Sequence, residues 1–477
     1  RPSKPGSAGA TVRDGAQKVL TLAMKSEWAP VEAVLKGLEK AVAAGGDDAN
    51  LTPLAGVMDP ATGMTPLMYA VKDNRTPILD RLIELGSDVG ARNNDNYNVI
   101  HIASMFSRED VVKLLLNKRG VDPYSMGGSR QQTAVHLVAS RQTGTATAIL
   151  RALLTAAGKD IRAKTDGKGK IPLLLAVEAG NQSMCRELLS AQTADQLKAT
   201  TNNGDTALHL AARRKDVEMA RILVDYGANV DLQNGDGQTA LHIAAAEGDE
   251  AMVKYFYTVR ASASIIDNQD RTPMHLAAEN GHASIIEILA DKFRASIYER
   301  TKDGSTLMHI ASLNGHAECA TTLFKKGVYL HMPNKGGARS IHTAAKYGHV
   351  GIISTLLNKG ERVDVPTNDN YTALHIAVQS AKPAVVETLL GFGAEVHVRG
   401  GKLRETPLHI AARVKDGDRC ALMLLKSGAG ANKTTDDGQT PVHVAAKYGN
   451  VLTMDQLLED NGDPLVKSKV RKRGVAR

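Results

Sequence analysis

The amino-acid sequence predicts an all-α solenoid, in which helix–turn–helix repeats stack one on another and hairpin loops project between them. Two observations lead to this fold class. A phrase close to Thr-Pro/Ala-Leu-His recurs at intervals of 33 to 38 residues, most often 33 or 34. Aromatic residues make up only 4% of the 477 residues. With so few large rings, the core must consist of thin layers of Leu, Ile, Val and Ala, as between stacked helices.

The recurring phrase marks the start of each repeat and so predicts the domain organisation. The starts are Thr65, Asn98, Thr133, Ile171, Thr206, Thr239, Thr272, Thr306, Arg339, Thr372, Thr406 and Thr440. They predict about twelve repeats over residues 65–466, a helical cap over residues 1–64 and a basic tail over residues 467–477. A cap is expected because an end repeat cannot bury its outer apolar face alone. The tail does not supply the repeat that residues 462–466 would introduce, so we expect the array to be truncated there.

Each recurring residue has a local structural task. The Thr hydroxyl can accept bonds from the free N–H groups of a helix, and Pro fits the first helical position. A glycine such as Gly248 then ends this helix, and pairs such as Leu188-Leu189 give the second helix an apolar face toward the next repeat. Turn dipeptides such as Asp236-Gly237 predict the hairpin-like loop. In the cap, residues 12–44 read as two helices broken near residues 27–30.

The net charge of the chain is concentrated at one end. Of a formal charge of +8, six cations lie in the last twelve residues, so the rest of the chain is close to neutral. The sequence pI of 9.2 is therefore weak evidence for a polyanion-binding domain, and we expect no nucleic-acid partner.

Cysteine use and hydropathy indicate where such a chain would reside. Cys185, Cys319 and Cys420 lie far apart and form no C-x-x-C pair, which favours a reducing compartment. No apolar run approaches the ~18 residues needed to span a bilayer. We therefore expect this segment to be soluble in the cytosol, without direct insertion into the membrane.

Histidines are the residues that most invite an interpretation as a metal or catalytic site. Ten of the fifteen occupy the same repeat position, as His209 and His409 do, and each is a repeat length from the next. Because metal sites need clustered ligands, a structural task is favoured, in which each histidine ties loop backbone to a helix start. Residues 167–170 lack the spacing of a phosphate loop, and no nucleophile–base set emerges. We expect no enzyme activity, no cofactor and no metal ion.

A row of basic residues is the candidate partner-binding site. Each member falls seven residues after its repeat start: Lys72, Arg213, Lys346, Arg413 and Lys447. Stacking could line them along the inner helices, where an acidic partner would meet a broken positive stripe. The alternative is purely structural, since a cation in the last turn of a helix complements its dipole, and Glu178 and Glu279 interrupt the row.

The period and the wording of the repeats, for example Thr239-Ala-Leu-His242 and Thr406-Pro-Leu-His409, resemble the ankyrin repeat. More specific wording occurs at residues 19–28, 65–71 and 455–459. It resembles the N-terminal cytoplasmic region of the insect mechanosensory channels of the TRPN family, also called the "no mechanoreceptor potential C" channels.

The TRPN resemblance implies a function for the whole protein. It implies a tether and gating spring that links a mechanically gated cation channel to microtubules, at the cytoplasmic face of the plasma membrane in a sensory cilium. The partners implied are tubulin, the remainder of the channel chain and three further copies in a homotetramer. The alternative is a general ankyrin-repeat adaptor that binds membrane or signalling proteins.

Overall fold

The computed structural model describes residues 7–44, 52–142, 144–158, 160–191 and 193–468. Its contacts divide the chain into two compact units, here called unit 1 (residues 1–236) and unit 2 (residues 237–477). Within the described residues, the only β-type pairings are three isolated bridges, Gly127 with Gln132, Thr200 with Thr206 and Gly400 with Glu405. The predicted all-α class with hairpin-like loops is confirmed.

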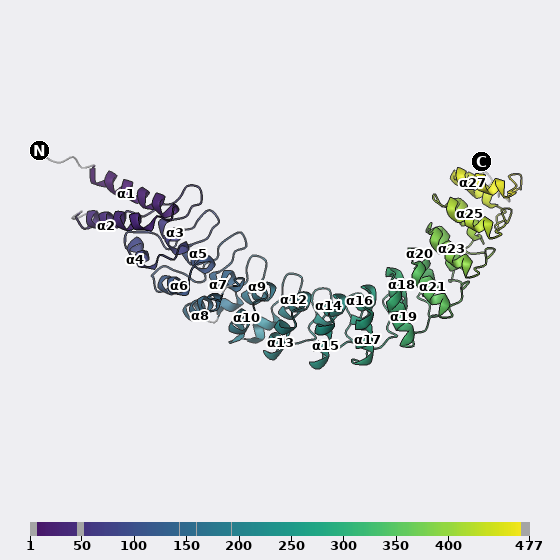
Figure 1. Cartoon of the computed structure of the whole chain (residues 1–477), viewed down its shortest axis with the longest axis horizontal. Helices are drawn as coiled ribbons and strands as arrows, with labels where there is room; N and C mark the ends of the chain where they lie inside the picture. Colours follow the sequence, from purple (N-terminus) through teal and green to yellow (C-terminus); the bar gives the residue numbers. More distant parts are fainter. Residues whose placement is uncertain (1–6, 45–51, 143, 159, 192, 469–477) are drawn as a thin grey trace, which may run out of the picture. The chain divides into compact units, whose positions relative to one another are not determined.

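Unit 1 is a series of helix pairs (Figure 1). Its α-helices are α1 (Ser7–Met24), α2 (Trp28–Ala44), α3 (Pro66–Lys72), α4 (Thr76–Glu84), α5 (Val99–Phe106), α6 (Glu109–Leu116), α7 (Ala134–Ala139), α8 (Ala146–Ala157), α9 (Pro172–Ala179), α10 (Gln182–Leu189), α11 (Thr193–Lys198), α12 (Ala207–Arg213) and α13 (Val217–Asp225). A short 3₁₀ helix, η1 (Asp160–Ala163), lies between α8 and α9.

Unit 2 continues the same alternation with greater regularity. Its helices are α14 (Ala240–Ala246), α15 (Glu250–Thr258), α16 (Pro273–Glu279), α17 (Ala283–Asp291), α18 (Leu307–Asn314), α19 (Ala317–Lys325), α20 (Ser340–Tyr347), α21 (Val350–Asn358), α22 (Ala373–Gln379), α23 (Pro383–Gly391), α24 (Pro407–Arg413), α25 (Asp418–Lys426), α26 (Pro441–Tyr448) and α27 (Val451–Glu459).

Helices of the same kind pack side by side within each unit. In unit 2 the first helices of successive repeats contact one another from α14 through α26, and the second helices do so from α15 through α27 (Figure 1). In unit 1 the first helices contact one another in the order α3, α5, α7, α9 and α12. The first helix of each repeat is called its inner helix below, and the second its outer helix. The core therefore lies between neighbouring repeats, where side chains such as Leu241, Ile353 and Leu389 are fully buried.

Each of the twelve predicted repeat starts is the N-cap residue of a first helix. The predicted glycine breaks also hold, as Gly248 and Gly227 adopt positive φ values of 70° and 96°. Positive φ at these positions is available to glycine without steric cost.

The long interval before Ile171 places extra chain within the repeat and after it: α7 ends at Ala139 and α8 begins at Ala146, whereas α12 ends at Arg213 and α13 begins at Val217. Part of the extra chain lengthens α8 to 12 residues, and part forms η1 after it. The short α11 between α10 and α12 was not predicted either. The irregular wording of this region thus corresponds both to a longer connection between α7 and α8 and to additional helix.

The two helices expected before the first repeat are present as α1 and α2, with the break at residues 25–27. Trp28 is buried, and its Nε1–H donates to Asp73 Oδ2 at 2.9 Å, at the end of the first repeat's inner helix. This pair therefore continues the stack. Residues 1–6 and 45–51 of the predicted cap lie outside the described residues, as do residues 469–477 of the basic tail.

Candidate partner-binding surface

The five residues of the basic row lie at corresponding places, at or near the end of a first helix. Lys72 and Arg213 end α3 and α12 in unit 1, whereas Lys346, Arg413 and Lys447 lie in the last turns of α20, α24 and α26 in unit 2. The helical register that the sequence predicted for the row is therefore present in each unit, and the surroundings of the side chains decide what each cation can bind.

The two arginines of the row are held by carboxylates of their own repeat. Arg213 lies 3.3 Å from Asp205, and Arg413 lies 2.7 Å from Glu405. In both cases the carboxylate stands eight residues earlier, directly before the repeat start. Because Asp205 and Glu405 are largely buried, these pairs orient the arginines and reduce the charge they present to a partner.

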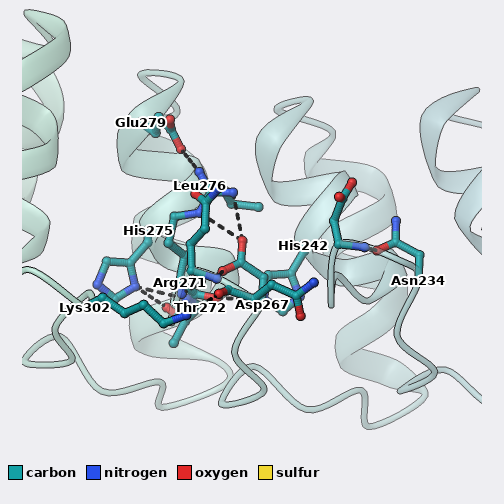
Figure 2. A network of polar contacts seen from close by, with 12 residues as sticks. Asn234, His242, Asp267, Arg271, Thr272, His275, Leu276, Glu279 and Lys302 are labelled. Atoms are coloured by element: carbon teal, nitrogen blue, oxygen red, sulfur yellow. Dashed lines mark hydrogen bonds and ion pairs between the residues drawn. The ribbon is translucent and has the colours of Figure 1, made fainter. Parts of the chain in front are cut away.

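The glutamates that interrupt the row are paired in the same way with reversed sign. Glu178 lies 2.5 Å from Lys170, and Glu279 lies 2.8 Å from Arg271. Figure 2 shows the second pair, in which Arg271 also contacts the buried Asp267 at 2.8 Å. Burial acts to raise the pKa of Asp267, but hydrogen bonds from the Arg271 side chain and from the backbone N–H groups of Arg271 and Gln269 hold it below its ordinary value.

The three lysines of the row differ, because they have no carboxylate partner among the described residues. Each Nζ instead lies over an aromatic ring, with Lys72 5.7 Å from the centre of Phe106, Lys346 5.5 Å from Tyr347 and Lys447 5.6 Å from Tyr448. Such contacts leave the positive charge available. The structure thus divides the predicted row into paired arginines and lysines open to an acidic partner.

A hollow of about 320 Å³ adjoins Lys346 between the ends of α18, α20 and α22. Its lining includes Asp303 from the loop, His309 and His342 from the helix starts, and Tyr347. The hollow combines one open cation with apolar walls. This arrangement suits contact with a protein side chain.

The recurring histidines connect each repeat to the following loop, as at His409. The Thr406 N–H donates to His409 Nδ1 at 3.2 Å, so Nε2 carries the proton and donates to the Gln439 carbonyl at 3.0 Å. The same two contacts occur at His101, His136, His242, His275, His309, His342 and His375. The predicted tie between loop backbone and helix start is confirmed, and the bond to the next repeat is an addition to it.

These histidines are held in the neutral state. Burial lowers the pKa to about 4 at His101, His275, His342, His375 and His409, although the carbonyl contacts act in the opposite direction. A protonated ring would also place an N–H against the backbone N–H that Nδ1 accepts. Among the described residues, no three His, Cys, Asp or Glu side chains come together as a metal site.

A second set of contacts, which the sequence did not predict, holds the other end of several inner helices. His282 Nε2 donates to the Ala246 carbonyl, His316 to Glu279 and His349 to Leu313, each at 2.9 Å. Other donors replace histidine elsewhere: Ser107 on Val71, Arg214 on Glu178 and Asn450 on Ala412. These bonds satisfy carbonyls that a helix end leaves unpaired. The recurrence of Gly-His after the first helix was the available signal.

Two further properties concern the cysteines and the lengths of the helices. Cys185, Cys319 and Cys420 are buried, and burial raises the pKa of their thiols to about 12, 11 and 11. Thiols with such values are poor nucleophiles. Within the part of the chain that the structure describes, none of the helices has the length and apolar character needed to cross a bilayer.

Comparison with known proteins identifies the repeat. The family model described as "Ankyrin repeats (3 copies)" matches residues 32–127, 194–267, 241–334, 308–400 and 392–468. The solved ankyrin repeat domain of human ASB11 aligns over 48% of this chain and 100% of its own, with 26% sequence identity and a TM-score of 0.42.

Curated relatives share only part of their length with this chain. The transient receptor potential cation channel subfamily A member 1 of Homo sapiens is 30% identical over 176 residues, 35% of this chain and 15% of that protein. The nuclear factor NF-kappa-B p105 subunit of Gallus gallus is 30% identical over 171 residues, 36% of this chain and 17% of its own. For the human B-cell lymphoma 3 protein the values are 28% over 212 residues, 36% and 45%.

Ankyrin repeats are typically modules for protein–protein interaction rather than enzymes, and their partners are proteins. Both the family match, which covers most of the repeats, and the uniform helix starts point to this class. The chain belongs to the ankyrin-repeat family and is a scaffold for protein–protein interaction.

Proposed function

We propose that this chain is the cytoplasmic tether and gating-spring segment of a mechanically gated cation channel, and that it links the channel to microtubules. The observation that carries the proposal is the set of open lysines, Lys72, Lys346 and Lys447, which face solvent without a carboxylate partner among the described residues. Tubulin surfaces and tails are acidic, so these cations suit that partner.

The arrangement of the repeats supports a mechanical role. Each first helix packs on the first helices of the repeats next to it within a unit. Stability in such an array is a sum of repeat terms and neighbour terms, so load is shared among many similar interfaces. A stack of this kind can extend by small shifts at each interface without the loss of any single layer.

The similarity to a transient receptor potential cation channel supports the connection to a pore. The proposed channel is a homotetramer whose remaining chain forms the membrane part, at the plasma membrane of a sensory cilium. In this proposal the ankyrin segment carries out no catalysis and binds no cofactor.

A second candidate is a general adaptor that binds membrane or signalling proteins. The matches to the NF-kappa-B p105 subunit and to the B-cell lymphoma 3 protein favour it, because they cover a similar share of this chain. The two candidates differ in the partner, and a test of microtubule binding therefore separates them.

Cosedimentation with microtubules across a salt series tests the tether. In every protein used, the six cations of residues 467–477 are replaced by Gln, because this tail would bind any polyanion. The parent is expected to sediment with microtubules at low salt and to dissociate as salt screens the contact over a Debye length of about 8 Å.

The decisive variant reverses the three open lysines, Lys72→Glu, Lys346→Glu and Lys447→Glu. The matched control reverses Lys164, Lys402 and Lys415, which are also exposed and give the same change in net charge. Loss of binding in the first and not in the control supports the tether. Equal binding by both, or no binding by the parent, refutes microtubule attachment through this row and leaves the adaptor.

A further inference from the structure

Unit 2 carries a second surface, made of residues that do not belong to the basic row, in the loops at the ends of the second helices of three repeats. We define the aromatic–basic surface as Tyr298, Tyr329, His331, Lys359 and Arg362, which lie in or beside the loops that follow α17, α19 and α21. Tyr298 is 52% exposed and Tyr329 is 56% exposed. Exposed rings of this size are unexpected in a chain with so few aromatic residues, and they are enriched where proteins bind one another.

The two tyrosines form a fixed platform. Their rings stack with centroids 6.0 Å apart and an interplanar angle of 26°, and Tyr329 also contacts His331 at 5.6 Å. The Tyr298 hydroxyl donates to the Gly327 carbonyl at 3.3 Å, which ties one repeat's loop to the next. Because the rings are already held in place, a partner that packs on them loses little additional entropy.

Beside the platform lies a hollow of about 560 Å³. Tyr329 and His331 line it together with Phe324, Arg339, Lys359 and Arg362. The Lys359 Nζ lies 5.3 Å from the centre of the Phe324 ring, so the ammonium group stands at an aromatic wall. The hollow is large enough for one aromatic side chain of a partner and offers that side chain rings to pack against.

The charged residues of the hollow determine whether an acidic or a basic group of a partner fits there. Glu361, its single carboxylate, is only 8% exposed and accepts from Arg339 Nη1 and from the Arg362 backbone N–H, each at 3.0 Å. Arg339 therefore neutralises it. Lys359 and the Arg362 side chain have no carboxylate partner among the described residues, so two cations remain for an acidic group.

We propose that the aromatic–basic surface binds an acidic segment of a protein partner that carries an aromatic side chain. The partner's ring packs against Tyr329 in the hollow, and its carboxylates pair with Lys359 and Arg362. Charge-assisted bonds around a buried aromatic anchor are the combination that gives small interfaces their affinity. This proposal does not rest on microtubule attachment, since none of its residues belongs to the basic row.

Selection of displayed random twelve-residue peptides tests the proposal. The peptide pool is first depleted on the variant Tyr298→Ser, Tyr329→Ser, Lys359→Glu, Arg362→Glu and is then selected on the parent chain. Peptides retained by the parent are expected to be enriched in Asp and Glu around at least one Trp, Tyr or Phe. Recovery of no such peptide, or of peptides without that enrichment, overturns the proposal.

The most enriched peptide is then synthesised and its binding is measured by fluorescence anisotropy. Reversal of Lys359 and Arg362, or replacement of both tyrosines by Ser, should each weaken binding by about tenfold or more. Matched controls are Lys402→Glu with Lys415→Glu, and Phe392→Ser with Tyr257→Ser, which alter exposed residues elsewhere in unit 2. These should stay within about twofold, and circular dichroism should show unchanged helicity for every variant.

Competition with a twelve-nucleotide single-stranded oligothymidylate separates a protein partner from a nucleic acid, which could also use rings and cations. The oligonucleotide is expected to displace the peptide only at concentrations far above the peptide's Kd. Tighter binding by the oligonucleotide, or equal weakening by the control variants, overturns the assignment to an acidic protein segment.

Discussion

The repeats that begin at Ile171 and at Thr406 build the same helix start from different side chains. Their N-cap backbones nearly coincide, with φ −81° and ψ 162° at Ile171 and φ −84° and ψ 162° at Thr406. Both continue with Pro at the first helical position. At the fourth position of the phrase, however, Leu174 replaces the histidine, and like His409 it is fully buried.

Leu174 and His409 fill the same buried space in different ways. His409 is stable there because both ring nitrogens have backbone partners, whereas Leu174 needs none. The apolar version is insensitive to protons, and the polar version fixes the position of the following loop. The backbone conformation that both repeats share thus requires a side chain of suitable volume at this position. The histidine adds directional hydrogen bonds and makes the stability of its repeat sensitive to acid.

Acidification should cause the largest loss of stability. It should affect repeats that contain the histidine more than the repeat that lacks it. Each histidine with a folded pKa of about 4 binds its proton more readily when unfolded, where the pKa is near 6.5. The contribution of these histidines to the free energy of unfolding is fully present above pH 6.5. It falls as the pH drops from there toward 4, by up to about 3 kcal/mol for each such histidine.

Urea unfolding followed at intervals between pH 7.5 and 4 measures this loss. Hydrogen exchange corrected for its intrinsic pH dependence should show that α9, in the repeat without the histidine, is destabilised less than α20, α22 and α24. A stability that stays constant down to pH 5 would show that the histidines are already protonated or have little influence.

Truncation of a buried leucine should give the next largest effect, of similar size in the repeat that begins at Ile171 and in the regular repeat that begins at Thr372. Leu174→Ala and Leu389→Ala each remove a fully buried side chain and should cost about 2–5 kcal/mol. Because contacts run between neighbours, hydrogen exchange should rise mainly in the repeats on either side of the substitution. A uniform rise from residue 65 to residue 466 would indicate a more cooperative array.

Conversion of the polar version to the apolar one, His409→Leu, should cost about 1–3 kcal/mol at pH 7.5, because the buried Thr406 N–H loses its acceptor. At pH 5 the parent itself loses about 2 kcal/mol through this histidine, and the variant does not. The difference between the two proteins should therefore shrink or vanish on acidification. If the substitution cost the same stability at both pH values, the lost hydrogen bond alone would explain that cost, and protonation of His409 would play no part in it.

The smallest effect is expected at the paired arginines of the basic row. Arg213→Met removes an ion pair whose arginine is about half exposed, and it should change stability by no more than about 1 kcal/mol. Thermal unfolding measures the change, with Lys415→Met as a control for the loss of an exposed cation. A loss above about 2 kcal/mol would make the pair a structural element rather than a surface contact.

The sequence predicted the helix starts well because each is encoded locally. Even Ile171 and Arg339, which replace Thr, begin helices at the predicted positions. The short α11 was missed because no recurring phrase announces it. The register of the basic row was predictable, but its division was not, because the partners of Arg213 and Arg413 stand in loops whose path the spacing does not define.

The aromatic–basic surface could not be predicted from the sequence for a related reason. Tyr298 and Tyr329 occur in loops of different wording, 31 residues apart, and no motif links them. Only the stacking of consecutive repeats brings the two rings together. Surfaces that cross repeats depend on the geometry of the stack, whereas helix starts depend on neighbours in the chain.

The two sets of inter-repeat hydrogen bonds give the array a polarity. The histidine at the start of an inner helix donates to the loop leading into the following repeat, and the carbonyls at the end of that helix accept from the same following repeat. Both ends of the helix are thus secured from one side. A repeat that loses its successor leaves both ends of its own inner helix unpaired, whereas one that loses its predecessor leaves only a loop carbonyl and the donor before its second helix without partners. Loss of the neighbour on the carboxyl side therefore exposes an inner helix at both ends, and loss of the neighbour on the amino side does not.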